Sequence, residues 1–376
     1  MMAKAKTTDV MLEQATLVAV RDILRLRKGE RVVIVTNPEP DVDAISRALY
    51  RQAEGAGGAP LLIYQPVKGQ LDYADRAVIQ ALSSEPDVLL SISHEKLGKD
   101  RDAMSKPIRV KRRGRRSYKK YNHVFDYLLY EARSRSFWSP GVTVDMFSRT
   151  VPIDYGLLQE RAARLGYGLS RAEEVHVTTP SGTDVVVGVR GRKASKDDGA
   201  FHRPGSGGNV PAGEVYVSPE LKASDGTLVF DGSISSDRGE IMIQRPITCR
   251  LEGGFVTKVS GGNEARKLRG TLERSEKKAR EMASDGRLPP PQGKIYAANA
   301  YNLGELGIGL NPAAKIVGNM LEDEKAFRTC HFAIGANYDD DAPALTHLDG
   351  LMKEPTISVS YPSGRRRVLL EEGNLL

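Results

Sequence analysis

Three short segments dominate the C-terminal part of this sequence: GELGIG at residues 304–309, CHFAIG at 330–335 and THLDG at 346–350. Each is an apolar run interrupted by glycine and carrying an acidic or imidazole side chain. The chain has only six histidines, and His331 and His347 both fall here. Side chains two apart on an extended strand point the same way, so His347 and Asp349 can reach one ion.

Two imidazoles and a carboxylate form a ligand set suited to zinc, iron or cobalt. Each residue also has a structural alternative, because a histidine in an apolar run is often a core residue. The acidic run Asp339–Asp341 is expected to be a solvated loop, and the glycines around Glu305 could mark turns. What favours a metal site is the gathering of His, Glu, Asp and Tyr side chains within residues 305–349.

Length and composition predict a soluble protein of two domains. A chain of 376 residues exceeds one ordinary hydrophobic core, and 40% hydrophobic with 27% charged residues is typical of globular proteins. No apolar run approaches the ~18 residues of a membrane span, and the N-terminus lacks the apolar segment of a signal peptide. With only two cysteines, Cys249 and Cys330, we expect a reducing, cytoplasmic location and no disulfide framework.

The positive charge is concentrated in one segment. Residues 106–120 contain nine basic residues, more than the whole net charge of +7. Tyr118 and Tyr121 border the run, which raises the hypothesis of a non-catalytic nucleic-acid-binding protein. A solvated loop or subunit contact is the preferred interpretation, so nucleic acid is not expected as a partner.

The first 165 residues predict an α/β domain with a parallel sheet. Continuous apolar strands are expected at 31–36, 60–64 and 86–92, alternating with helices at 11–26, 41–53 and 73–82. Further helices are expected at 124–132 and 154–165. No Gly-x-Gly-x-x-Gly follows the first strand, so nothing supports dinucleotide binding.

Residues 166–376 predict a β-rich α+β domain that binds metal. Short strands bounded by glycine turns are expected at 175–187, 214–217, 227–231, 240–244, 247–251 and 254–259. A helix is expected at 265–282, followed by a break at Pro289–Pro291. The glycine-rich loop before Glu214 delivers this carboxylate to the start of a strand, as a ligand or as an exposed strand residue.

The order of these motifs resembles the thermophilic metallo-aminopeptidase family, which includes aminopeptidases T and S. The matching elements are Asn-x-Pro-x-Gly-Glu-Val, Leu-Gly-Glu, Asp-Glu-Lys, Cys-His-x-Ala-Ile-Gly, a tyrosine seven residues after that histidine, and His-x-Asp. They span roughly residues 170–360. The resemblance implies a homodimer and two divalent metal ions (zinc, cobalt or manganese) held by Glu214, Glu305, His331, His347 and Asp349.

In that family Tyr338 matches an active-site tyrosine, and the expected activity is hydrolysis of N-terminal residues from small peptides. Glu305 would bridge the ions or act as general base, and Tyr338 would donate to the oxyanion. A divergent branch of the same fold contains a mononuclear iron dioxygenase that opens dihydroxypyridine rings, for which His331, His347 and Asp349 would suffice. The extra carboxylates of Glu214 and Glu305 favour the aminopeptidase, since they can hold a second ion.

Overall fold

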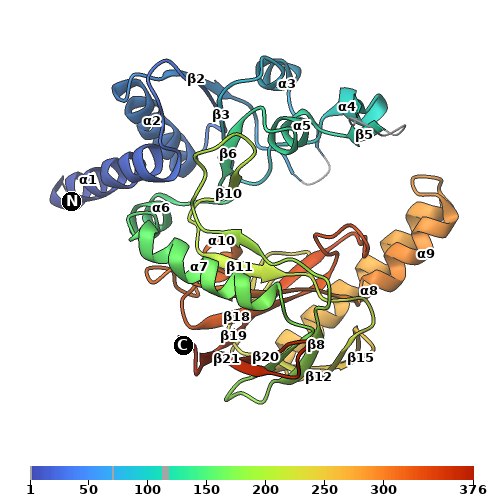
Figure 1. The fold of residues 1–376 in the computed structure, drawn as a ribbon. Helices are drawn as coiled ribbons and strands as arrows, with labels where there is room; N and C mark the ends of the chain where they lie inside the picture. The colour runs from blue at the N-terminus through green and yellow to red at the C-terminus, as the bar shows by residue number, and fades with distance from the viewer. Residues whose placement is uncertain (1, 70–71, 112–117) are drawn as a thin grey trace. The chain divides into compact units, whose positions relative to one another are not determined.

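The computed structural model describes residues 2–69, 72–111 and 118–376 (Figure 1). Their contacts divide the chain into two compact units, one of Met1–Gln159 with Asp197–Ala212, the other of Glu160–Lys196 with Gly213–Leu376. The sequence predicted a single division at residue 165. The structure differs because Asp197–Ala212 belongs to the first unit, where β10 (Gly207–Asn209) pairs with β6 (Arg135–Trp138).

The first unit is built on a five-stranded parallel sheet with the strand order β10-β6-β3-β1-β2. Its remaining strands are β1 (Arg31–Thr36), β2 (Ala59–Tyr64) and β3 (Val88–Ile92). All five residues of β3 are buried, as are five of the six in β1. Continuous burial is typical of parallel strands that helices cover on both faces, which explains their uninterrupted apolar sequences.

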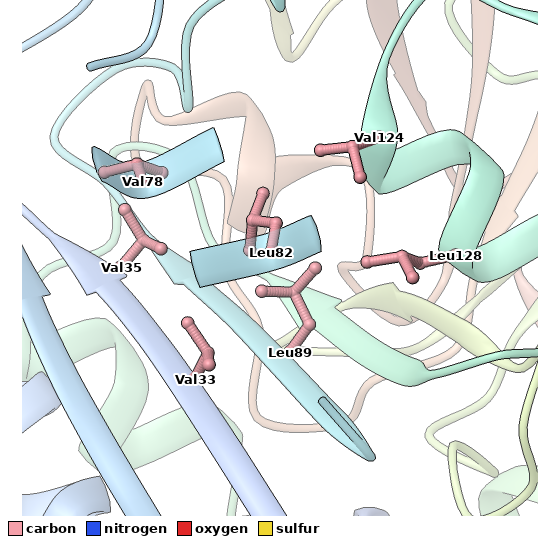
Figure 2. Close-up of a cluster of buried hydrophobic side chains, with 7 residues drawn as sticks. All are labelled: Val33, Val35, Val78, Leu82, Leu89, Val124 and Leu128. Atoms are coloured by element: carbon pink, nitrogen blue, oxygen red, sulfur yellow. The ribbon is translucent and has the colours of Figure 1, made fainter. Parts of the chain in front are cut away.

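Helices α3 (Arg76–Ser83) and α5 (Val124–Tyr130) pack on one face of this sheet. Figure 2 shows the cluster that joins them to β1 and β3: Val33, Val35, Val78, Leu82, Leu89, Val124 and Leu128. Side chains alternate along a strand, so Val32 and Ile34 point to the other face. Helix α2 (Pro40–Gly55) contacts β1, β2 and β3, and α1 (Met2–Val18) packs against α2 and α6 (Val144–Thr150).

The described ends of the basic segment lie on two paired strands of this unit. Strands β4 (Ile108–Lys111) and β5 (Tyr118–Tyr121) pair antiparallel, after α4 (Arg101–Ser105). The Lys119 ammonium lies 4.7 Å and 5.0 Å from the ring centroids of Tyr121 and Tyr130. Arg112, Arg113, Arg115 and Arg116 lie outside the described residues, so the solvated-loop interpretation of this run stays a prediction.

The second unit contains two antiparallel sheets. The seven-stranded sheet has the order β14-β13-β19-β18-β17-β11-β9. Its strands are β9 (Ser195–Asp197), β11 (Glu214–Val217), β13 (Ser233–Ile234), β14 (Ile241–Met242), β17 (Leu303–Gly309), β18 (Thr329–Gly335) and β19 (His347–Lys353). Together with the parallel sheet of the first unit, these sheets confirm the predicted fold class.

The eight-stranded sheet has the order β16-β15-β12-β8-β7-β20-β21-β22. Its strands are β7 (Glu174–Thr178), β8 (Asp184–Gly188), β12 (Ser224–Phe230), β15 (Ile247–Glu252), β16 (Phe255–Ser260), β20 (Thr356–Ser360), β21 (Arg366–Glu371) and β22 (Asn374–Leu375). Valines alternate with exposed residues along β7 and β8, the period of a sheet with one covered face.

Four helices complete the chain: α7 (Tyr155–Leu169), α8 (Asn263–Ser284), α9 (Pro290–Asn299) and α10 (Met320–Asp323). The predicted break at Pro289–Pro291 is confirmed, because α8 ends at Ser284 and a separate helix, α9, begins at Pro290. Proline is favoured in the first helical turn, where its missing N–H would have no intrahelical partner. In the described part of the chain, no helix combines the length and apolar character needed to cross a membrane.

A buried ion pair ties β6 to the loop before β1, and its loss should destabilise the first unit. Arg135, 3% exposed, donates two hydrogen bonds to Glu30 (2.9 Å and 2.6 Å) and one to the Leu24 carbonyl. Arg135→Met leaves the Glu30 carboxylate without this partner, and we expect a loss of about 3–5 kcal/mol in unfolding free energy. Urea unfolding followed by the fluorescence of Trp138, the only tryptophan, measures it.

The exposed pair Arg47–Asp43 provides the control, since Arg47→Met should cost less than about 0.5 kcal/mol. Burial alone would raise the pKa of Glu30, but the hydrogen bonds from Arg135 hold it below the ordinary value. The pair therefore stabilises above pH ~4.3, and this contribution is lost as the pH falls further. Equal losses in both variants, or an acid sensitivity that survives Arg135→Met, would contradict the assignment.

Candidate metal centre

The predicted ligands gather on one face of the seven-stranded sheet. They lie on four neighbouring strands: Glu214 on β11, Glu305 on β17, His331 on β18, and His347 and Asp349 on β19. Residues paired across an antiparallel sheet share a face. Ala333 pairs with both Glu305 and Asp349, which brings these two carboxylates to the same side.

Small residues between the ligands make room for them. Gly307 pairs with His331 and Gly309 pairs with Glu214, so each large side chain faces a glycine on β17. A Cβ atom at Gly307 would lie 1.9 Å from Nε2 of His331. The glycines of GELGIG therefore serve strand packing at the centre, and the alternative that they mark turns is wrong, since β17 runs through all of them.

Glu305 joins the two histidines. Its Oε1 lies 3.1 Å from Nε2 of His331, and its Oε2 lies 3.4 Å from Nε2 of His347. Nε2 of His347 is also 3.2 Å from Oδ1 of Asp349. On the other ring nitrogen, His347 Nδ1 lies 2.7 Å from the Ala336 carbonyl, to which it donates. That bond leaves Nε2 directed at the carboxylates, as in metal sites where a second partner fixes the imidazole tautomer.

Two groups of three residues have ligand atoms close enough to hold an ion: Glu305 with His347 and Asp349, and Glu214 with Glu324 and His331. Within each group the atoms lie within 4.8 Å of one another. Among the described residues, Oε2 of Glu214, Oε2 of Glu305 and Oδ1 of Asp349 are buried without a well-aligned hydrogen bond, although an imidazole Nε2 lies 3.2–3.5 Å from each. Buried carboxylate oxygens without partners are costly, and a bound cation would satisfy them. The residues therefore fit a metal ion.

The pKa shifts within the cluster also favour a bound metal ion. Burial lowers the pKa of an imidazole, but the hydrogen bond to Glu305 and the charge of Glu214 raise that of His331 to about 9. Burial also lowers the pKa of His347, but Asp349 and Glu305 outweigh burial and raise it well above its ordinary value. Burial would raise the pKa of Asp349, but His347 brings it to about 2. Without metal the imidazoles carry protons, which a metal ion would replace.

Glu324 and Lys325 belong to the cluster, although the sequence analysis did not assign them to it. Lys325 is fully buried, and its Nζ lies 2.8 Å from Oε1 of Glu214 and donates to Glu324. Burial raises the pKa of both carboxyls, and the Lys325 charge opposes that rise. Their place in Asp-Glu-Lys, a few residues before Cys-His, was the only sequence signal.

Tyr338 lies at the open side of the centre. Its ring centroid is 5.0 Å from that of His347 and 5.4 Å from that of Tyr216, and 63% of its surface is exposed. Burial of its phenol and the negative charges of Glu305 and Asp349 raise the pKa of Tyr338 above the ordinary value, the charges being the firmer cause because much of the residue is exposed. Tyr338 therefore stays protonated and can donate a hydrogen bond. The nearby Asp339 and Asp341 pair with Arg192.

Residues 143–360, which include the whole cluster, match the family model described as NicX, 2,5-dihydroxypyridine 5,6-dioxygenase. The chain belongs to this dioxygenase family. A curated relative of the same name from Pseudomonas putida (strain KT2440) is 32% identical over 156 residues. That alignment covers 41% of this chain and 39% of the relative, so the matched segment spans about two fifths of the relative's length.

Two solved structures share the fold. The 2,5-dihydroxypyridine dioxygenase from Pseudomonas putida KT2440 superposes with a TM-score of 0.70 at 16% identity, covering 98% of this chain and 97% of that one. AmpT from Thermus thermophilus gives a TM-score of 0.65 at 19% identity, with 97% and 99% covered. At such identities the two likenesses establish the architecture alone, which the aminopeptidase resemblance had implied.

The predicted aminopeptidase activity is wrong. The family model and the curated relative both carry the dioxygenase name, which had been the alternative. The preference for a peptidase rested on Glu214 and Glu305 as spare ligands for a second ion. In the structure Glu214 has an ammonium partner in Lys325, and Glu305 contacts the histidines instead of standing apart from them. Counting carboxylates in the sequence could not reveal these pairings.

Proposed function

We propose that this enzyme is a ring-opening dioxygenase that uses one non-haem iron(II) ion and acts on a dihydroxypyridine or a closely related hydroxylated ring. The single observation behind the proposal is the match of residues 143–360 to the dioxygenase family, over a segment that contains a buried cluster of two imidazoles and several carboxylates. The reaction class breaks one ring carbon–carbon bond and places both atoms of O2 in the product.

Under this proposal His331, His347 and Asp349 hold the iron, since two imidazoles and one carboxylate form the facial triad of non-haem iron oxygenases. When bound, iron(II) supplies the binding and activation of O2 that no side chain can provide. The site roles of these three residues remain a prediction of the sequence, supported by the contacts of both histidines with Glu305 and of His347 with Asp349.

Glu305 and Tyr338 would act on the substrate. The hydrogen bonds and charges of His331 and His347 hold the pKa of Glu305 below its ordinary value against its burial, so it is an anion that can take the proton of a ring hydroxyl. Tyr338, which stays protonated beside His347, can donate to an oxygen that gains negative charge during ring opening. Of the two roles predicted for Glu305, bridging ligand or general base, we therefore propose the second, with a ring hydroxyl as the proton donor.

The test is to incubate the purified protein, loaded anaerobically with iron(II), with 2,5-dihydroxypyridine and O2. We expect loss of the ring absorbance, O2 consumption equal to substrate consumption, and a product heavier by both oxygen atoms. Zinc-loaded protein is the control and should be inactive, because zinc has no redox chemistry. Full activity with zinc, or the absence of O2 consumption with a panel of dihydroxypyridines and dihydroxybenzenes, would contradict the proposal.

A further inference from the structure

The second ligand group already contains a cation that belongs to the protein. Glu214 and Glu324 are two of the three residues in this group, and the Lys325 ammonium contacts an oxygen of each. Lys325 is 0% exposed and Glu214 is 6% exposed. A buried lysine keeps its charge only beside anions, and neighbouring buried carboxylates repel each other unless a cation lies between them. The three side chains therefore stabilise one another.

An additional metal ion would compete directly with this ammonium. Its ligands would be the carboxylates of Glu214 and Glu324, both of which Lys325 contacts. Binding would require Lys325 to leave its carboxylates while remaining in an interior where no water replaces them. His331 does not need this ion, because its Nε2 is nearer to Glu305 (3.1 Å) than to Glu214 (3.5 Å).

We propose that Lys325 takes the place of a second metal ion, so that the enzyme binds a single ion at His331, His347 and Asp349. The inference concerns the number of ions that the residues hold. It rests on the proposed function only for the statement that this ion is iron. Lys325 is a positioning residue: it keeps Glu214 and Glu324 away from the iron, whose remaining positions stay open for substrate and O2.

The experiment counts ions in the full-length protein. Metal-free wild type, Lys325→Ala and Lys325→Met are dialysed to equilibrium with manganese(II), and bound metal is measured per chain. We expect about one ion in wild type and about two in Lys325→Ala, with an electron paramagnetic resonance spectrum of two coupled manganese ions in the variant alone. Lys68→Met, which removes the partner of Asp75 in the first unit, is the matched control and should bind about one ion.

Two ions in wild type, or one ion in folded Lys325→Ala and Lys325→Met, would overturn the proposal. If the single variants fold only with metal, that result supports the proposal, because a metal ion then replaces the missing ammonium. The double variant Lys325→Met with Glu324→Gln provides a second measurement. The double variant has lost one charge of each sign, so it should fold without manganese and bind about one ion; two ions in it would refute the inference. Manganese counting needs no turnover, so an absence of dioxygenase activity would leave this result intact.

Discussion

Glu305→Gln should lower turnover of the ring substrate by about a hundred- to ten-thousandfold, the usual contribution of a general base. The amide keeps the shape of the side chain and one acceptor oxygen near His331 and His347, but it cannot take a proton. Iron content should stay close to that of wild type, because the proposed ligands are unchanged. Steady-state O2 consumption and elemental analysis of the same preparation measure both quantities.

His347→Ala distinguishes a base from a ligand. It removes an imidazole whose Nδ1 is fixed by the Ala336 carbonyl, so iron should be lost together with activity, and excess iron should restore part of both. If Glu305→Gln loses iron to the same extent, Glu305 is a ligand first and the proton acceptor must be another group. Near-normal turnover in Glu305→Gln would exclude Glu305 from the chemistry.

Gly307→Ala is expected to have the second large effect, although it adds one methyl group and no charge. The new Cβ would lie 1.9 Å from Nε2 and 2.1 Å from Cε1 of His331, which is fully buried and has no free space to enter. Overpacking of this kind costs about 1–3 kcal/mol of stability. Because the clash falls on the proposed ligating nitrogen, iron affinity should fall at least tenfold, a loss comparable to that from disturbed metal surroundings.

Gly55→Ala is the matched control, since its Cβ at the end of α2 would meet nothing within 4 Å. We expect it to leave iron affinity unchanged and stability equal or slightly higher, as alanine is the better helix former. Iron titration and thermal unfolding of both variants decide the matter. Unchanged iron affinity in Gly307→Ala would show that the His331 ring can move without leaving the metal, and would weaken its assignment as a ligand.

The activity was predicted wrongly because a sequence does not show which distant side chain a carboxylate pairs with. Glu214 was counted as available for a metal ion from the glycine-rich loop before it and from its match to a ligand of the aminopeptidase family. Its partner Lys325 lies 111 residues further along the chain. The two side chains meet because β11 and β18 flank β17 in the sheet and Lys325 lies just before β18. A carboxylate paired with a buried ammonium and one free for a metal look identical in the sequence.

Much of the architecture was nevertheless determined by local sequence. Apolar runs such as RVVIVT at residues 31–36 are strands in the structure because only a sheet covered on both faces buries every side chain of such a run. The alternation in His347-x-Asp349 likewise fixed these two residues on one face, since the pleat of a strand repeats every two residues. Glu305 and His331 were identified in the same way, as single polar side chains among apolar neighbours.

Tertiary structure alone decided the rest. Strand register placed Gly307 opposite His331 and Ala333 opposite both Glu305 and Asp349, and register is set by the packing of a whole sheet rather than by any one segment. Other tertiary contacts buried Lys325 among carboxylates and paired β10 with β6 in the parallel sheet of the first unit. The sequence by itself indicated the candidate ligands except Glu324, whereas the fold decided which of them are already paired, because pairing and burial depend on contacts between residues far apart in the chain.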